Sequence, residues 1–328
     1  MSSLRKHTPA LLALAALSIT AAASVATFEG TADAAVDSTF TFAVLPDTQL
    51  ETKVAGDPRF RNRTTWLVNH RTALDLRFAL HSGDLVDWDT ADHAQNQVAA
   101  GAMKVLQDAG LHYSIAPGNH DTAAVCPGGA ACDATRTKTL VRDTKTFNAY
   151  NTTATFGAVS EVFEAGKVDN AFSTYSAGGL QWGVLNLELW PRTTVIDWAR
   201  RVVAAHPKHN IIVVTHSYLN DDGTISTSPG YGQNSPQYLF DRLISQYPNV
   251  KFVFSGHTGV EAARQDTGVN GNRIYSFLGA FHDGTTNPVR LVEVDTAANT
   301  ISSRIYAPYT NTSYPQYDHQ ITGVSWAR

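Results

Sequence analysis

The sequence has few charges and no run of basic residues. Charged residues make up 16% of its 328 residues, and the formal net charge is -4. We therefore expect neither a specific nucleic-acid surface nor a general membrane-binding surface. Hydrophobic residues (43%) and aromatic residues (10%) are plentiful. The chain can thus bury a sizeable core, in one large domain or two small ones.

Long apolar runs are also scarce, and the clearest one, at 10–23, indicates a signal peptide. It follows a positively charged start at 5–7, and it is short for a membrane span, which needs about 20 apolar residues. Small-x-small cleavage sites follow at 24–26 and 32–34. The alternative is an uncleaved membrane anchor. We expect cleavage at the second site, which gives a secreted, extracellular monomer without a membrane span, comprising one domain over 35–328.

Cysteine is limited to two residues, Cys126 and Cys132. In an exported protein this spacing indicates a small disulfide loop. A metal-binding pair is the alternative, although the chain has no further cysteine to join it. We predict the disulfide.

The first third of the chain predicts three β-loop-α units. Strands are expected at 39–45, 77–81 and 111–116, with helices at 58–76 and 91–109 between them. Each predicted strand runs into a polar group. In open α/β sheets, ligands bind outside the carboxyl ends of the strands, so these groups are expected to form one site.

The remainder is less regular at first and then rich in strands. Residues 122–170, with a predicted helix at 136–150, are interpreted as an insertion over the site. A hairpin at 171–176 and 180–189 precedes a helix at 193–205, a strand at 210–214, a helix at 236–247 and a strand at 250–254. Alternating strands at 273–278, 289–294 and 300–306 suit a second, largely antiparallel sheet.

The most informative stretch is Pro117-Gly118-Asn119-His120-Asp121, directly after the third predicted strand. Gly118 permits a tight turn. Three adjacent polar side chains are costly to bury unless they bind something. The other polar strand ends are Asp47, Asp84, His216 and His257. Carboxylate, amide and imidazole ligands suit divalent metals, and two ions about 3.5 to 4 Å apart can clamp a phosphoryl group.

These motifs, in this order, resemble the signature of calcineurin-like metallophosphoesterases. The matching blocks are Asp47-Thr-Gln49, Gly83-Asp84, Gly118-Asn119-His120-Asp121, His216 and Gly256-His257-Thr-Gly259, over about 40–257. The resemblance implies an α/β fold, a four-layer α/β/β/α sandwich with two mixed sheets. It also implies one or two divalent ions per chain (Mn, Fe, Zn or Mg).

The resemblance implies a role for each matching residue. Asp84 would bridge two ions. Asn119, His216 and His257 would complete one ion's site, and Asp47 would bind the other ion.

The third motif would supply the acid–base group. His120 would contact the phosphoryl group and assist the leaving oxygen without binding metal, with Asp121 orienting its ring.

Two positions depart from the family pattern, Gln49 and Gly259, where the family usually has histidine. Both missing imidazoles belong to the same ion, which keeps Asp47, Asp84 and the Gln49 amide oxygen. An oxygen-rich site favours Mg²⁺ or Mn²⁺ and should bind more weakly. Glu261 and His282 are the candidates for a substitute ligand.

Other polar and aromatic residues are interpreted without motif support. His81 lies in a predicted strand and is expected to be structural. Asp87 and Trp88 either line the cleft or start a loop. Trp190 and Tyr218 are expected to be packing residues.

We therefore predict a secreted metal-dependent phosphoesterase that hydrolyses a phosphodiester or phosphomonoester by metal-activated water. The alternative is a family member with a depleted metal site that binds a phosphorylated or carbohydrate ligand without hydrolysis. The substrate would be a small molecule or a polymer, selected by the insertion and by the loop at 220–234.

Overall fold

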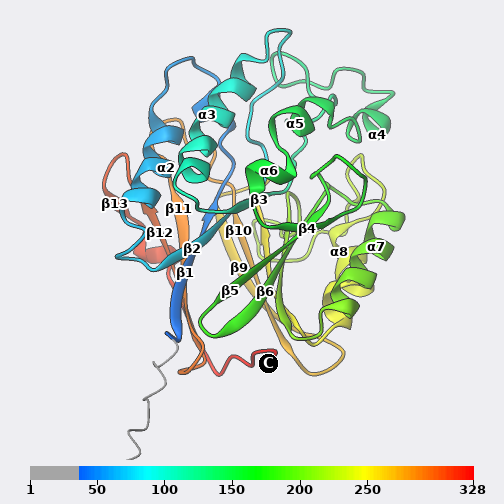
Figure 1. The fold of residues 1–328 in the computed structure, drawn as a ribbon. Coiled ribbons are helices and arrows are strands. Elements are labelled where there is room, and N and C mark those ends of the chain that lie inside the picture. The colour runs from blue at the N-terminus through cyan, green and yellow to red at the C-terminus, as the bar shows by residue number, and fades with distance from the viewer. Residues whose placement is uncertain (1–36) are drawn as a thin grey trace, which may run out of the picture. The chain divides into compact units, whose positions relative to one another are not determined.

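A computed structural model describes residues 37–328, and these form two stacked β-sheets with helices on both outer faces (Figure 1). The predicted signal peptide falls within residues 1–36 and lies outside the described residues. Among residues 37–328, no helix has the length and hydrophobicity needed to cross a membrane.

The first sheet has the strand order β13-β12-β11-β1-β2-β3, and β14 also pairs with β12. Strands β1 (Thr39–Leu45), β2 (Leu76–His81) and β3 (Tyr113–Ile115) run parallel. The crossovers between them contain α1 (Gln49–Thr52), α2 (Arg59–Asn69) and α3 (Ala94–Asp108), and α2 and α3 cover the outer face (Figure 1).

The other half of this sheet comes from the end of the chain. Strand β11 (Val289–Asp295) pairs antiparallel with β1, and β12 (Thr300–Ala307) pairs antiparallel with β11. The short strands β13 (Thr312–Ser313) and β14 (His319–Thr322), with the 3₁₀ turn η2 (Pro315–Tyr317) between them, complete this edge.

The second sheet has the order β4-β5-β6-β7-β8-β10-β9. Its parallel centre consists of β6 (Leu180–Leu187), β7 (His209–Thr215), β8 (Val250–Ser255) and β10 (Arg273–Gly279). Antiparallel strands flank the centre: β4 (Val159–Val162) and β5 (Ala171–Ala177) on one side and β9 (Glu261–Thr267) on the other.

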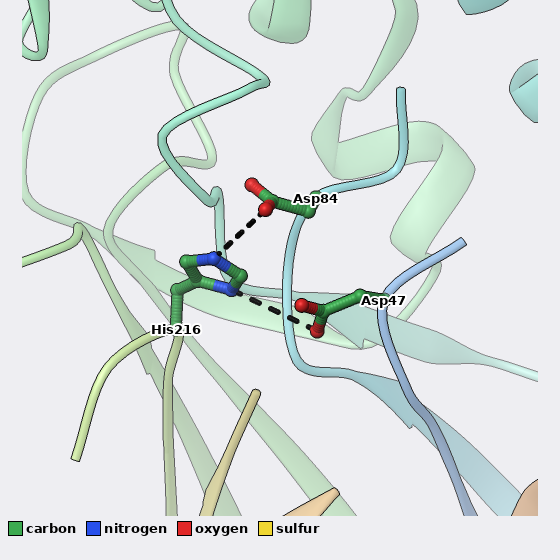
Figure 2. Close-up of side chains that lie close together, drawn as sticks. All are labelled: Asp47, Asp84 and His216. Atoms are coloured by element: carbon green, nitrogen blue, oxygen red, sulfur yellow. Dashed lines mark ion pairs between the residues drawn. The ribbon is translucent and has the colours of Figure 1, made fainter. Parts of the chain in front are cut away.

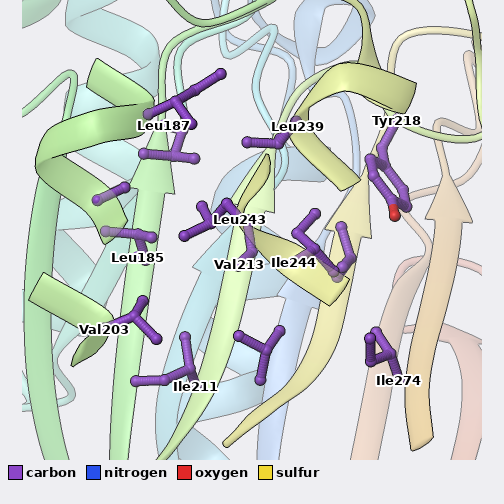
Figure 3. Packing of buried hydrophobic residues seen from close by; sticks show 14 of the residues in the cluster. Leu185, Leu187, Val203, Ile211, Val213, Tyr218, Leu239, Leu243, Ile244 and Ile274 are labelled. Atoms are coloured by element: carbon purple, nitrogen blue, oxygen red, sulfur yellow. The ribbon is translucent and has the colours of Figure 1, made fainter. Parts of the chain in front are cut away.

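Helices α7 (Thr193–Ala205) and α8 (Pro236–Arg242), followed by the 3₁₀ turn η1 (Ile244–Gln246), cover the second sheet's outer face. Figure 3 shows their side chains packed on the sheet, with Val203 of α7 beside Ile211 and with Leu243, directly after α8, beside Val213. The amphipathic face of each helix is what holds it there.

Aromatic rings fill the space between the two sheets. Phe42 of β1 stacks on Phe78 of β2 with ring centroids 5.1 Å apart. Its ring also meets Phe252 and Phe254 of the second sheet edge-on, at 5.9 and 5.7 Å. This layered arrangement confirms the predicted α/β fold class with two mixed sheets.

The prediction that the last three strands build a separate antiparallel sheet is wrong. Strand β10 lies parallel to β8 inside the second sheet, whereas β11 and β12 extend the first. Alternating hydrophobicity indicates that a segment is a strand but does not identify its neighbour. Here β1 has an open hydrogen-bonding edge, and β11 covers it.

Residues 122–170 contain several short elements instead of one predicted helix at 136–150. They are α4 (Thr137–Leu140), α5 (Lys145–Tyr150), α6 (Thr153–Phe156) and β4. The helix is interrupted where the Thr144 hydroxyl donates to Asp169 at 2.5 Å. Cys126 and Cys132 form a disulfide in this segment, as predicted.

Candidate metal centre

The carboxyl ends of five strands meet at one edge of the two sheets. Asp47 follows β1, Asp84 follows β2 and Asn119 follows β3, while His216 and His257 follow β7 and β8 of the other sheet. All of these side chains are buried except that of His257, which is partly buried. The site thus draws on both sheets.

Asp47, Asp84 and His216 lie close enough to share one ion (Figure 2). One candidate ligand atom from each residue lies within 4.8 Å of the others. His216 Nε2 is 3.1 Å from Asp84 Oδ2, and His216 Nδ1 is 4.0 Å from Asp47 Oδ1.

Several buried polar atoms of this centre have no hydrogen-bond partner among residues 37–328. They belong to four of the six predicted ligands: Asp47 Oδ1, Gln49 Oε1, Asn119 Oδ1 and His216 Nε2, the last of which lies 3.1 Å from Asp84 without hydrogen-bond geometry. A buried polar atom without a partner costs about 1 to 3 kcal/mol. Since these atoms are all metal-ligand types on residues at or just beyond the strand ends, and Asp47 and His216 lie within reach of one ion, the centre fits divalent cations.

The tautomer of His216 is set by the loop after β2. Its Nδ1 lies 2.9 Å from the Ser82 carbonyl oxygen, which can only accept, so Nδ1 carries hydrogen, and Nε2, which faces Asp84, is the atom that gains or loses a proton. Burial opposes charge on this ring, but the carboxylates of Asp84 and Asp47 outweigh it and raise the pKa of His216 to about 9. A cation at Nε2 would take the place of that proton.

Asp84 occupies a backbone conformation that few residues other than glycine adopt, with φ of +53°. Its Oδ1 accepts the backbone N–H of His120 at 3.0 Å. A Cβ at Gly118 would come within 2.0 Å of that oxygen. Burial alone would raise the pKa of Asp84, but His216 outweighs it and lowers the pKa below its usual value.

Asp47 and His257 are linked through the backbone. The His257 N–H donates to Asp47 Oδ2 at 3.0 Å, and a Cβ at Gly256 would lie 2.0 Å from Asp47 Oδ1. The His257 ring stands edge-on to His216, with centroids 5.0 Å apart. Burial, with the nearby His216, lowers the pKa of His257 to about 4, so its ring is neutral and can ligate.

The predicted role of Asp121 in orienting the His120 ring is wrong. Its carboxylate accepts backbone N–H groups from Gly118 at 2.8 Å and from Leu85 at 2.9 Å, which ties two motif loops together. The His120 Nδ1 instead lies 2.5 Å from the carbonyl oxygen of Asp87. Because a backbone carbonyl accepts from any sequence, no side-chain motif marks this contact.

Asp87 lies beside His120, which favours the interpretation that it lines the site. Its side chain is buried, lies 3.7 Å from His120 Nδ1 and forms an ion pair with Lys53 at 2.8 Å. Trp88 faces the same lysine, whose ammonium lies 4.7 Å from the ring centre.

His81 is structural, as predicted. The backbone N–H of Gly83 donates to its Nδ1 at 3.1 Å, so its Nε2 carries the hydrogen shared with Thr48 Oγ1, also at 3.1 Å. The Thr48 hydroxyl in turn donates to the Leu85 carbonyl. Burial lowers the pKa of His81 to about 3, which keeps the ring neutral.

Of the two candidates for a substitute ligand, the structure brings only His282 to the centre. Glu261 pairs with Arg290 at 2.7 Å and His319 at 2.9 Å. The His282 Nε2 lies 2.8 Å from Asp47 Oδ2. Gly259 itself could not carry an imidazole here, because its φ is +67° and a Cβ would meet Asp221 at 1.7 Å.

The two aromatic residues near the strand ends differ. Tyr218 is fully buried in the core under α8, as expected for a packing residue. Trp190, with φ of +44°, also packs but stands edge-on to the His257 ring at 5.3 Å, so it forms part of the wall behind that ligand.

Known proteins match this chain in sequence and in fold. It is 25% identical to the uncharacterized protein YvnB of Bacillus subtilis (strain 168) over 294 residues, which cover 82% of this chain but 20% of that protein. The chain thus spans about a fifth of the length of this relative.

A dimetal phosphatase from Danio rerio has a similar fold, with a TM-score of 0.50 and 10% sequence identity, over 86% of this chain and 98% of that one. The family model for calcineurin-like phosphoesterases matches residues 40–261, which include Asp47, Asp84, Asn119, His216 and His257. The chain therefore belongs to the calcineurin-like phosphoesterase family, whose members are metal-dependent hydrolases of phosphoric esters.

Proposed function

We propose that this chain hydrolyses a phosphomonoester or phosphodiester outside the cell, using divalent ions held at the strand ends. The observation that carries the proposal is the set of buried ligand atoms on Asp47, Gln49, Asn119 and His216 that make no hydrogen bond among the described residues. Bound ions would activate water and neutralise charge on the phosphoryl group.

His120 has the geometry expected of the group that hands a proton to the leaving oxygen. Its Nδ1 donates to the Asp87 carbonyl, so the proton available for transfer is the one on Nε2. Its backbone N–H is held by Asp84, which fixes the ring close to the ligands. Its side chain is 15% exposed, so a substrate can reach it.

An extracellular location is supported by two features of the chain. One is the apolar N-terminal run with its small-residue cleavage sites. The other is the Cys126–Cys132 disulfide, because such bonds persist mainly in oxidising compartments. Mass spectrometry of the N-terminus of protein recovered from the culture medium tests this location. Protein that stays bound to cells and keeps its uncleaved N-terminal segment would contradict it.

The rival function is ligand binding without hydrolysis, favoured by the glutamine and glycine at positions 49 and 259. We would assay residues 35–328 with Mn²⁺ on p-nitrophenyl phosphate and on bis(p-nitrophenyl) phosphate. Hydrolysis would be supported if the chain turns over either ester and Asn119→Ala abolishes this activity. Asn270→Ala, at an exposed position, is the control and should retain it. Metal-loaded protein inactive on both esters would support the binding function.

A variant of His120 tests its role separately. His120→Ala should slow turnover mainly for esters with poor leaving groups, by about 10²- to 10⁴-fold, because it removes the proton donor. Metal content should stay the same, since His120 is not a ligand in this scheme. Loss of metal along with activity would assign His120 to the metal site instead.

A further inference from the structure

We propose that His282 is a ligand of a second divalent ion, held together with Asp47 and Gln49. His282 would replace the imidazoles that positions 49 and 259 lack. The inference rests on the proposed function for the reason the ions are there, but it concerns metal binding and is tested by metal binding.

The first argument is the contact between His282 and Asp47. The Nε2 of His282 lies 2.8 Å from Asp47 Oδ2, while Asp47 Oδ1 has no hydrogen-bond partner among residues 37–328. Imidazole and carboxylate ligands lie about 2.0 to 2.2 Å from an ion such as Zn²⁺, so two ligands on one ion come about 3 to 3.5 Å apart. In the structure this contact is a hydrogen bond, and only a small shift is needed for the imidazole to ligate an ion at Asp47.

The second argument is Gln49, which lies two residues beyond Asp47 at the start of α1. Its Oε1 is buried without a hydrogen-bond partner among the described residues. An amide oxygen is a suitable ligand for a hard divalent ion. Gln49 therefore supplies an oxygen where the missing histidine would have supplied nitrogen.

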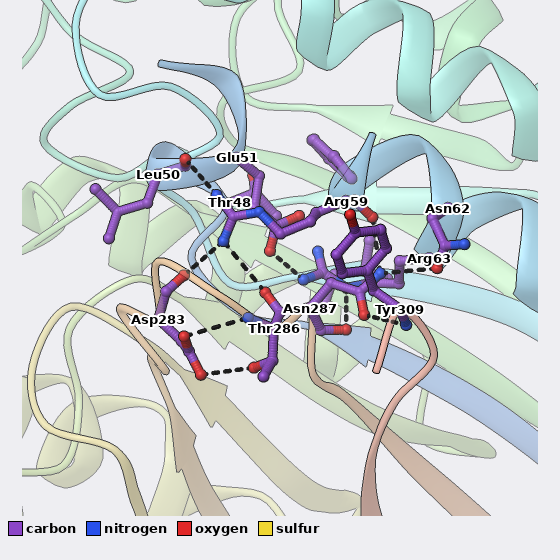
Figure 4. A network of polar contacts seen from close by, with 12 residues as sticks. Thr48, Leu50, Glu51, Arg59, Asn62, Arg63, Asp283, Thr286, Asn287 and Tyr309 are labelled. Atoms are coloured by element: carbon purple, nitrogen blue, oxygen red, sulfur yellow. Dashed lines mark hydrogen bonds and ion pairs between the residues drawn. The ribbon is translucent and has the colours of Figure 1, made fainter. Parts of the chain in front are cut away.

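The third argument is that a buried network fixes the His282 loop against α1 (Figure 4). Arg59 donates to the carbonyl oxygens of Leu50 at 2.8 Å and of Asp283 at 2.9 Å. Fully buried Arg63 pairs with Glu51 and donates to the carbonyl oxygen of Asn287 at 3.0 Å. The same two arginines thus hold the segment carrying Gln49 and the segment carrying His282.

The backbone conformation of the residue before His282 also supports the proposal. Phe281 has φ of +49°, a conformation that is uncommon for aromatic residues and costs about 1 to 3 kcal/mol. Such strain persists where surrounding contacts hold it, and it gathers at ligand sites. Here it accompanies a turn that brings His282 to Asp47.

Calorimetric titration of metal-free residues 35–328 with Mn²⁺ tests the proposal. We expect two binding events per chain. His282→Ala should weaken one of them at least tenfold and leave the other intact. His319→Ala is the matched control, because its ring pairs with Glu261 away from the centre, and it should keep both events.

Electron paramagnetic resonance gives a second readout that does not depend on activity. Two Mn²⁺ ions sharing a carboxylate should give an exchange-coupled spectrum in the parent chain, and His282→Ala should show a single-ion spectrum. His282→Asn, a smaller change, provides the same comparison if the alanine variant does not fold.

The outcomes separate this inference from the proposed function. Two ions bound equally by the parent and by His282→Ala would overturn the role of His282, as would one ion in an active parent; either leaves hydrolysis standing. The parent chain could instead bind two ions, bind the second more weakly in His282→Ala, and hydrolyse no ester. That result would support His282 as a ligand and rule out the proposed function.

Discussion

At the scale of single residues, each motif is held in place by another motif. Asp84 accepts the N–H of His120, Asp47 accepts the N–H of His257, and His216 donates to the carbonyl of Ser82. These bonds use one ligand atom of each side chain. Of the other atoms, Asp84 Oδ2 and His216 Nε2 lie 3.1 Å apart, and Asp47 Oδ1 has no hydrogen-bond partner among the described residues. The ligands are therefore oriented before any ion binds, which reduces the cost of binding it.

The metal-free chain should lose stability as pH rises, because of His216. Its pKa in the folded chain is about 9 against an ordinary value of 6.5. Its contribution to stability is thus full below pH 6.5 and is lost as pH rises through 9. Bound Mn²⁺ replaces the proton, so the gain in Tm from Mn²⁺ should grow across this window.

Thermal melts with and without Mn²⁺ between pH 6 and 9.5 would measure this. His216→Asn, which does not titrate in that range, is the control and should show a smaller dependence on pH. A gain in Tm that is independent of pH in the parent chain would contradict the assignment.

Gly256 is a position where one added methyl group should damage the centre. A Cβ there would lie 2.0 Å from Asp47 Oδ1. Gly256→Ala should lower stability by about 1 to 3 kcal/mol and weaken Mn²⁺ binding, as read by denaturant unfolding and calorimetry. Gly101→Ala in α3, with nothing within 4 Å of the new methyl group, should stabilise the chain by about 0.5 to 1 kcal/mol.

At the scale of elements, the short helix α1 and the loop after β10 depend on buried charge. Arg63 is fully buried with Glu51, whose pKa burial raises to about 6 despite the arginine. Since the same arginine donates to Asn287, it connects the metal-facing end of α1 with the His282 loop.

Arg63→Met should cost about 3 to 5 kcal/mol, because it leaves Glu51 buried without its partner. It should also weaken the second Mn²⁺ event by releasing the loop. The double variant Glu51→Gln with Arg63→Met removes both charges and should recover much of the stability but not the loop's anchoring. Unchanged Mn²⁺ affinity in both variants would show that the network does not position His282.

At the scale of the whole molecule, the centre exists only where the two sheets meet. Asp47, Asp84 and Asn119 come from the first sheet, and His216 and His257 from the second. The aromatic layer around Phe42 joins the sheets. An ion held by ligands of both sheets therefore adds a link between them, which should stabilise the fold in proportion to its affinity and concentration.

Phe42→Ala should destabilise the chain by about 3 to 5 kcal/mol, because it opens a cavity between the sheets, where Phe42 is fully buried. Mn²⁺ should raise the Tm of this variant and of the parent alike, since the ligands lie outside the cavity. The number of Mn²⁺ ions bound per chain, measured below the melting range, should not change. Loss of an ion in this variant would show that the aromatic layer helps to position the ligands.

Local pattern determined much of this protein. Alternating and helical periodicity marked β1, β2, β7 and α7, and a polar group directly after a strand placed Asp47, Asp84, Asn119 and the two histidines at one edge. These inferences succeed because parallel strands of a sheet bring their carboxyl ends together whatever lies between them. The family motifs then supplied their chemistry.

Tertiary structure alone decided the rest. The residues of strand β11 do not indicate that β1 is its neighbour in the sheet. Pairing depends on which strand has an edge with unpaired backbone groups. Asp121 contacts backbone N–H groups, and His120 contacts a backbone carbonyl. Neither contact can be predicted from the sequence, because every residue has a backbone carbonyl and nearly every residue has a backbone N–H. His282 lies 235 positions from Asp47, and only buried arginines and the chain's path bring the two within 2.8 Å.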